Sequence, residues 1–189
     1  MRKLRILVDM DQVLNNLLDR WVEYLNVRYG ADASARDIKK WDLACVYPGL
    51  TKEEVDRPIG EDAFWGGLST MPHSVETMRR MVGDGHEVYV VTAASVYRTI
   101  PAKIDWLLAN YPFLAWEDVV IANKKQIVSG DVLIDDAVHN LEGGGYFKIL
   151  IDSPNNTGYD AEGNGMVRAP DLKVAYEIIK KEFGLRLAE

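Results

Sequence analysis

The chain has 189 residues, and apolar residues make up 48% of them. This composition predicts one globular domain with a sizeable core rather than a disordered chain. The net charge of −7 argues against a nucleic-acid polymer as the main partner, because binding such a polymer requires a basic face. The charge does not exclude a small phosphorylated ligand, which a single lysine and a metal ion can bind locally.

Cys45 is the only cysteine, so no internal disulfide is expected, as in proteins of a reducing compartment. The sequence begins directly with a strand-like run and shows no signal-peptide pattern. No apolar stretch is long enough to span a bilayer. We therefore expect a cytoplasmic protein without membrane association. The sequence leaves open whether the chain forms a homodimer.

Short runs rich in Val, Ile and Leu predict strands that are buried on both faces of a parallel sheet. They lie near residues 4–8, 87–91, 119–122, 132–134 and 148–151. Helical patterns cover residues 15–29, 52–57, 62–65, 74–81, 101–108 and 172–183. Residues 153–170, rich in Asn, Gly, Asp and Pro, predict a long loop. The alternation of strands and helices predicts an α/β fold with a Rossmann-like parallel sheet flanked by helices.

The interval between the first two strands is far longer than one crossover helix needs, which is typically about 10–15 residues. We expect residues 15–72 to form a small helical cap inserted into an α/β core domain. The core domain would then comprise residues 1–14 and 73–189. The cap is expected to lie over the sheet edge that carries Asp9.

Chemically useful side chains follow four of the predicted strands. In chain order they are Asp9 and Asp11, then Thr92, then Lys124 and Lys125, and finally Asp135 and Asp136. The carboxyl ends of parallel strands meet at one edge of the sheet, which is where ligands bind in open α/β folds. The sequence therefore predicts that these groups converge.

Converging carboxylates repel one another, at about 4 kcal/mol for a pair 4 Å apart and an effective dielectric near 20. Since only oxygen ligands are on offer, we expect Mg²⁺ to relieve the repulsion. Asp9, ionised at neutral pH, would attack a phosphorus atom and form an aspartyl-phosphate. Asp11 would protonate the leaving alcohol and then deprotonate the attacking water. The Thr92 hydroxyl, the following backbone N–H groups and a lysine would hold the phosphate.

These four motifs, in this order, resemble the haloacid dehalogenase-like (HAD) phosphatase superfamily. The resemblance spans the whole chain, and the insert lies where that superfamily has its helical cap. Three features are most similar to the 5'(3')-deoxyribonucleotidases. They are the motif DMDQVL, the nine-residue spacing between Lys125 and the Asp135 and Asp136 pair, and the run FKILIDSPNN.

The resemblance assigns the catalytic and metal-binding roles residue by residue. It implies that Asp9 is the nucleophile and a metal ligand, and that Asp11 is the acid/base and binds Mg²⁺ through its backbone carbonyl. Asp136 would complete the metal site, and Asp135 would support it by hydrogen bonding.

The resemblance also assigns substrate contacts. Thr92, the backbone of Ala93 and Lys125 would bind the phosphate, whereas Lys124 would face solvent. Aromatic residues of the cap would stack on a nucleobase, although buried aromatics often serve only as the core of a small subdomain. The candidates are Trp41, Phe64 and Trp65.

Four positions depart from the family pattern. Gln12 stands where glycine is usual, Ala93 where serine is frequent, Ala137 where arginine is frequent, and Leu17 where an aromatic residue often stacks on the base. None of these differences removes a catalytic group. They concern substrate recognition more than the chemistry.

We therefore expect a Mg²⁺-dependent phosphomonoesterase that acts on nucleoside monophosphates, above all deoxyribonucleotides. A HAD phosphatase or phosphomutase acting on a sugar phosphate is an alternative with the same motifs. Dehalogenation is another, although it needs neither a metal nor an acid equivalent to Asp11. A signalling receiver domain is disfavoured, because its acidic pair follows the first strand, whereas here the adjacent pair follows the fourth.

Overall fold

The structure, a computed structural model, describes residues 2–39 and 43–185. Within these ranges, six parallel strands form one sheet in the order β3-β2-β1-β4-β5-β6. The strands are β1 (Arg5–Val8), β2 (Glu87–Thr92), β3 (Val119–Ile121), β4 (Val132–Asp135), β5 (Phe147–Ile151) and β6 (Val167–Ala169). The predicted α/β fold with a parallel sheet is confirmed.

The prediction of an uninterrupted loop over residues 153–170 is wrong, because β6 lies within it. This edge strand pairs with β5, with Val167 opposite Ile149. Its three residues are too few to show an apolar pattern, and its strand conformation depends on pairing with a distant segment rather than on local propensity. The same interval also holds a short 3-10 turn, η7 (Pro154–Asn156).

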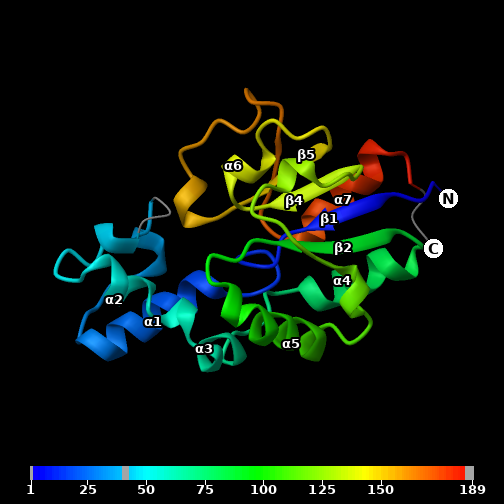
Figure 1. Cartoon of the computed structure of the whole chain (residues 1–189). Helices are drawn as coiled ribbons and strands as arrows, with labels where there is room; N and C mark the ends of the chain where they lie inside the picture. Colours follow the sequence, from blue (N-terminus) through cyan, green and yellow to red (C-terminus); the bar gives the residue numbers. More distant parts are fainter. Residues whose placement is uncertain (1, 40–42, 186–189) are drawn as a thin grey trace.

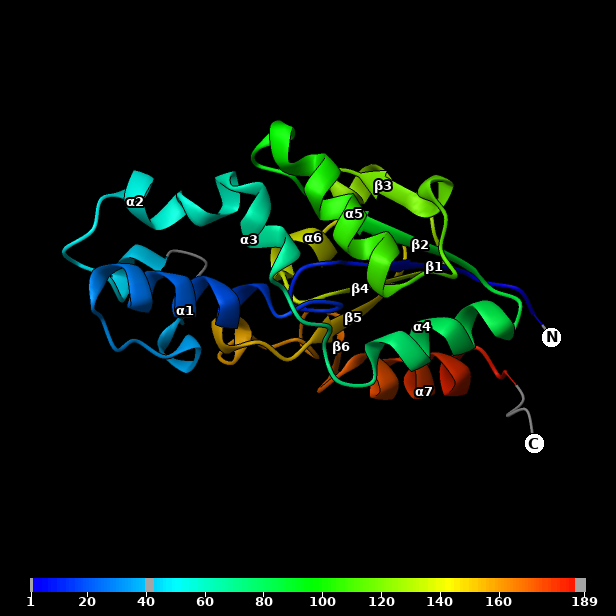
Figure 2. The same ribbon diagram turned by 90° about the horizontal axis from the view of Figure 1, so that it is seen from below.

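Alternate residues of the strands face two apolar layers. Ile6 and Val8 belong to a core cluster shared with α4 (Ser74–Gly83), α5 (Ile100–Asn110) and α7 (Leu172–Glu182). Leu7 faces the opposite layer, where it is clustered with Leu141 of α6 (Val138–Leu141) and with Met166. Helices α4 and α7 lie side by side (Figure 2). Burial on both faces explains why the strands read as continuous apolar runs.

Residues 17–39 and 43–68, which we call the helical segment, lie beyond the carboxyl ends of the strands, at the end of the sheet opposite both termini (Figure 1). The segment contains α1 (Leu17–Tyr29), α2 (Lys52–Asp56) and α3 (Asp62–Gly66), together with the 3-10 turns η1 (Ala35–Asp37), η2 (Leu43–Cys45) and η3 (Pro58–Gly60). Trp21 of α1 donates its indole N–H to the carbonyl of Val55 in α2 at 2.7 Å. Helix α3 packs against α5 of the core.

Two linkers, residues 12–16 and 69–71, connect the helical segment to the sheet, and they are bonded to each other. The backbone N–H of Asn16 donates to the carbonyl of Ser69 at 3.1 Å. The backbone N–H of Ser69 donates in return to Oδ1 of the Asn16 side chain at 2.7 Å. Met71 donates to the carbonyl of Leu14 at 2.9 Å. The chain therefore enters and leaves the helical segment at neighbouring points.

Gln12 adopts a left-handed conformation with φ of 60°. This conformation explains why glycine is usual at the position in the family that the chain resembles. The Gln12 side chain has a role that glycine cannot fill, because its Oε1 accepts the backbone N–H of Leu18 at 2.7 Å. That N–H lies in the first turn of α1, where donors have no partner within the helix.

The core also contains the 3-10 turns η4 (Tyr97–Thr99), η5 (Trp116–Asp118) and η6 (Lys125–Ile127). Among the described residues, no helix combines the length and the apolar character that crossing a membrane requires.

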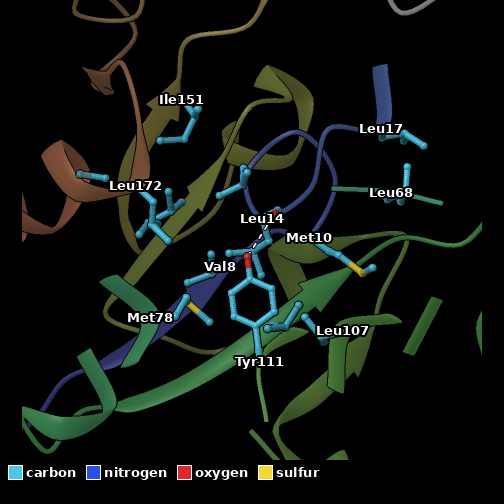
Figure 3. Close-up of a cluster of buried hydrophobic side chains, with 14 of the residues drawn as sticks. Val8, Met10, Leu14, Leu17, Leu68, Met78, Leu107, Tyr111, Ile151 and Leu172 are labelled. Atoms are coloured by element: carbon cyan, nitrogen blue, oxygen red, sulfur yellow. Dashed lines mark hydrogen bonds between the residues drawn. The ribbon is translucent and has the colours of Figure 1, made fainter. Parts of the chain in front are cut away.

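Tyr111 joins the end of α5 to the turn that follows β1 (Figure 3). Its ring is fully buried, and its hydroxyl donates to the carbonyl of Leu14 at 2.9 Å. The Ser74 hydroxyl lies 2.7 Å from the hydroxyl oxygen of Tyr111. This contact therefore fixes the first linker against the core.

We expect Tyr111→Phe to lower the free energy of unfolding by about 0.5–1.5 kcal/mol, because one buried hydrogen bond to the carbonyl of Leu14 is lost while the ring and the second donor, the backbone N–H of Met71, remain. Chemical denaturation followed by tryptophan fluorescence would measure the loss. Tyr24→Phe, which removes a solvent-facing hydroxyl bonded to Glu61, serves as the control and should change stability by less than about 0.5 kcal/mol. Equal effects of the two variants would contradict the role given to Tyr111.

Candidate active site

The predicted carboxylates meet where the strand order reverses, between β1 and β4. This reversal is the place where ligands bind in open α/β sheets. Asp9 follows β1, while Asp135 ends β4 and Asp136 comes next. Carboxylate oxygens of these three residues all lie within 4.8 Å of one another, and all three side chains are buried. Lys125, at the start of η6, inserts its ammonium between Asp9 and Asp135 and bonds to both.

The two adjacent aspartates differ in how the protein satisfies them. Asp135 accepts hydrogen bonds on both oxygens: from Lys125 Nζ at 2.6 Å, from the backbone N–H of Ala137 at 2.8 Å, and from the Asn140 amide at 3.1 Å. Asp136 Oδ2 is buried and has no hydrogen-bond partner among the described residues. The backbone carbonyl of Asp136 accepts from Asn156 at 2.8 Å. The peptide of Asp136 is therefore anchored while its carboxylate remains available.

Burial dominates the electrostatics of the cluster. The pKa of Asp9 is raised to about 7, chiefly by burial; Lys125 opposes the rise, and the carboxylates of Asp135 and Asp11 add to it. Burial, together with Asp135 and Asp9, also raises the pKa of Asp136 well above its ordinary value. For Lys125, burial lowers the pKa, but the attraction of Asp9 and Asp135 outweighs it, so the ammonium stays charged.

Asp11 is held by two buried side chains. Lys103 Nζ donates to Asp11 Oδ2 at 2.5 Å and to the carbonyl of Ala93 at 2.8 Å. The Asn15 amide donates to Asp11 Oδ1 at 3.0 Å. Lys103 also lies 4.9 Å from the centre of the Trp65 ring. The acid/base candidate is thus fixed from two sides, and the Asp11 side chain still lines the cavity.

The cluster opens into a cavity with two contrasting walls. Asp9, Asp11, Lys125 and Asp136 form the charged end. The remainder is largely apolar and is contributed by the helical segment and by the chain after β2. It includes Leu17, Trp21, Ile59, Trp65 and Val96. Such a cavity suits a small molecule with one anionic and one apolar end.

The predicted phosphate-binding residues differ in their positions. Thr92 ends β2 and is buried, and its hydroxyl lies 3.4 Å from the carbonyl of Ala93. Ala93 itself is exposed and lines the cavity. Lys125 is fully buried within the cluster, whereas Lys124 is exposed to solvent.

The aromatic residues predicted to contact substrate differ in whether they line the cavity. Trp65 lines the cavity. Phe64 does not belong to the described lining; it packs edge-on against Tyr24 and Trp65, with ring centres 6.2 and 5.8 Å apart. Trp41 lies outside the described residues. Trp21, which the sequence pattern places on the buried face of α1, lines the cavity as well.

Sequence reasoning missed Lys103 and Asn15. The signal for Lys103 is its place on α5 four residues before the buried Leu107, which puts a lysine on the inward face of an amphipathic helix. Asn15 carries no comparable signal, because an asparagine before a helix is expected as a cap.

The donor set fits a divalent cation. Ligands at hand are carboxylate oxygens, the hard donors that Mg²⁺ prefers. The unpartnered Asp136 Oδ2 and the raised pKa values of Asp9 and Asp136 both indicate that additional positive charge would stabilise the ionised cluster. Asp135, already satisfied by protein donors, suits a supporting role.

Comparison with known proteins agrees with this geometry. Residues 2–183 match the protein family described as "5' nucleotidase, deoxy (Pyrimidine), cytosolic type C protein". The 5'(3')-deoxyribonucleotidase of Bacillus subtilis (strain 168) is 37% identical over 152 residues, which cover 80% of this chain and 86% of the relative. The 5'(3')-deoxyribonucleotidase of Clostridium acetobutylicum is 31% identical over 172 residues, which cover 90% and 92% respectively.

Solved structures with low sequence identity share the fold. A HAD family hydrolase from Deinococcus radiodurans R1, with bound phosphate and sodium, superposes with a TM-score of 0.64 at 14% identity, over 97% of this chain and 98% of that one. The D,D-heptose 1,7-bisphosphate phosphatase from B. bronchiseptica, complexed with magnesium and phosphate, gives 0.58 at 15% identity, over 96% and 99%. The predicted resemblance is confirmed: the chain belongs to the cytosolic type C family of deoxy (pyrimidine) 5' nucleotidases and is a phosphoric monoester hydrolase with a HAD-like fold.

Proposed function

We propose that this protein is a Mg²⁺-dependent 5'(3')-deoxyribonucleotidase that hydrolyses nucleoside monophosphates through an aspartyl-phosphate on Asp9. The observation that carries the proposal is the cavity itself, which joins the carboxylate and lysine cluster to an apolar, aromatic wall. The names of the relatives from Bacillus subtilis and Clostridium acetobutylicum support the same substrate class.

The chemistry begins with Asp9, which lines the cavity and follows β1, a strand whose last three residues are buried. Its oxygen attacks phosphorus, while Asp11 gives a proton to the ester oxygen of the departing nucleoside. Water then attacks the phosphorus, Asp11 takes the proton back, and inorganic phosphate leaves. Lys125 uses two of its three N–H donors on Asp9 and Asp135, so the third can hold a phosphate oxygen.

The proposed Mg²⁺ would be held by the carboxylates of Asp9 and Asp136 and by the backbone carbonyl of Asp11. When bound, it would neutralise negative charge on the phosphoryl oxygens and on the carboxylates around them. The Deinococcus radiodurans and B. bronchiseptica proteins, which share the fold, were solved with sodium and with magnesium, respectively, which supports the proposal that this chain also binds a cation.

The apolar wall supports a nucleoside rather than a sugar as the leaving group. Trp65 and Trp21 can pack against a planar base. A sugar phosphate would place several hydroxyl groups against Leu17, Ile59 and Val96, where they would lose hydrogen bonds to water without replacement. The wall therefore favours the base and the deoxyribose over a polyhydroxylated group.

The first test measures phosphate release from a panel of deoxyribonucleoside and ribonucleoside monophosphates, with Mg²⁺ and with a chelator. We expect release that depends on Mg²⁺ and favours deoxyribonucleotides. Asp9→Asn should lower kcat by at least about 10³-fold, because the nucleophile is removed. Asp105→Asn, at an exposed position of α5, is the matched control and should retain activity. Turnover of sugar phosphates alone would contradict the proposed substrate class.

The second test uses stability instead of activity. Because the folded-state pKa of Asp9 is raised to about 7, its contribution to stability is fully present below its ordinary pKa and is lost as pH rises through about 7. Mg²⁺ binds the ionised form, so it should raise the melting temperature of chelator-treated protein more at pH 8 than at pH 5.5. Calorimetry of both samples at the two pH values measures this difference.

Asp136→Asn should abolish most of the Mg²⁺-induced rise in melting temperature, because it removes the unpartnered carboxylate oxygen. The rise should be unchanged in Asp105→Asn. A full rise in the Asp136 variant would show that the cation binds elsewhere.

The third test concerns the apolar wall. Trp65→Leu should raise KM for deoxyribonucleotides about tenfold while changing kcat little, because loss of base packing weakens binding by roughly 1–3 kcal/mol. Phe64→Leu, on the neighbouring ring outside the cavity lining, should leave KM nearly unchanged. Steady-state kinetics measure both KM values. A larger rise in KM for Phe64→Leu than for Trp65→Leu would contradict the proposal that Trp65 packs against the base.

A further inference from the structure

We infer that Asn15 is a positioning residue that aims the proton of Asp11 at the leaving group. The inference rests on the proposed function, in which Asp11 acts as the acid. Asn15 lies on the first linker, and the sequence alone did not predict a role for it. The carrying observation is the contact between the Asn15 amide and Asp11 Oδ1 at 3.0 Å.

The two oxygens of Asp11 face different donors. Lys103 Nζ donates to Oδ2 at 2.5 Å, and this ammonium is buried and also bonded to the carbonyl of Ala93. A proton on Oδ2 would point toward this positive charge, so Oδ1 is the better place for the proton that Asp11 transfers. Asn15 is the donor on Oδ1, and it is neutral.

A carboxyl oxygen has room for both contacts, because it has two lone-pair directions. The Asn15 amide occupies one direction of Oδ1, and the transferable proton occupies the other. Asn15 therefore determines the direction in which the Oδ1–H bond points. Without this contact, the carboxyl group is held only through Oδ2 and can rotate away from the cavity.

Asn15 is itself fixed in one orientation. The side chain is fully buried, and its Oδ1 accepts the backbone N–H of Leu17 at 3.1 Å. The flipped amide would place an oxygen against the Asp11 carboxylate and an NH₂ group against the Leu17 N–H, so both contacts would become repulsive. The Asn15 backbone donates to the carbonyl of Met10 and bridges to Thr70.

In the first chemical step, the Asp9 oxygen forms a bond to phosphorus, the bond from phosphorus to the ester oxygen breaks, and the proton on Asp11 Oδ1 moves to that ester oxygen. The nucleoside leaves as a neutral alcohol, and Asp11 is left as a carboxylate that accepts hydrogen bonds from Asn15 and Lys103. The same Oδ1 then takes the proton of the attacking water.

The test compares two substrates that differ in one atom. One is a deoxyribonucleoside 5'-monophosphate, and the other is its 5'-thio analogue, in which sulfur bridges the nucleoside and the phosphorus. A thiolate leaves readily without protonation, whereas an alkoxide does not. Loss of proton transfer should therefore slow nucleoside release in the first turnover from the oxygen ester and spare the release of the thionucleoside from the sulfur ester, whereas the later attack of water is the same for both substrates. A merely structural defect should slow both substrates alike.

We expect Asn15→Ala to lower the first-turnover rate of nucleoside release from the oxygen ester, followed by rapid quench, roughly three- to tenfold, as for the loss of one neutral hydrogen bond. The change for the sulfur ester should be less than about twofold. Asn15→Ser retains an oxygen for the Leu17 N–H but is too short to reach Asp11; it should show the same selective loss if Asn15→Ala folds poorly. Circular dichroism and thermal unfolding establish which variants are folded.

Two further variants make the outcomes distinguishable. Asn16→Ala removes the neighbouring linker contact to Ser69 without touching Asp11, so the ratio of the two rates should stay at the wild-type value. Asp11→Asn should lower the first-turnover rate for the oxygen ester by far more than the rate for the sulfur ester. Equal losses of first-turnover rate on both substrates in Asp11→Asn would reject the proposed acid role. A selective loss in Asp11→Asn with an unchanged ratio in both Asn15 variants would reject the role of Asn15 alone.

Discussion

The structure depends on a fully buried ammonium group. Lys125 lies between Asp9 and Asp135, on the line where the strand order of the sheet reverses. Removal of one partner from a buried charge cluster leaves uncompensated charge and is strongly destabilising. The lysine therefore connects the ends of β1 and β4 with the turn after β3. The nucleophile candidate Asp9 and the supporting Asp135 take their positions from this arrangement.

The same cluster separates carboxylates that the protein satisfies from those that it leaves available. Asp135 receives donors from three directions and acts as part of the scaffold. Asp136 keeps an unpartnered buried oxygen, although its backbone is anchored by Asn156. Such an oxygen is unfavourable in isolation and becomes favourable when a cation is bound. Folding thus holds the ligands rigidly in place, although their carboxylates repel one another.

Sequence reasoning succeeded where a signal is local. Apolar runs ending in Asp9, Thr92 and Asp135 predict both the strands and the edge at which their ends meet. It failed where the determining contact is distant in the chain. Strand β6, for example, is defined by pairing with β5. Asn15 was missed for another reason: its partner Asp11 is only four residues away, but the contact depends on the shape of the turn after β1, which the residue types do not reveal. For Lys103, the inward helical face was visible in the sequence, but its carboxylate partner lies 92 residues away.

The paired linkers have a consequence for how this architecture diversifies. Because the chain leaves the sheet near Asn16 and returns near Ser69, and these residues bond to each other, the described part of the intervening segment is joined to the sheet at one closed base. A change in the length or content of this segment would leave the strand order intact, because no strand of the described sheet lies within it. Two further contacts restrict such changes: Gln12 accepts the backbone N–H of Leu18, and α3 packs against α5, the helix that carries Lys103.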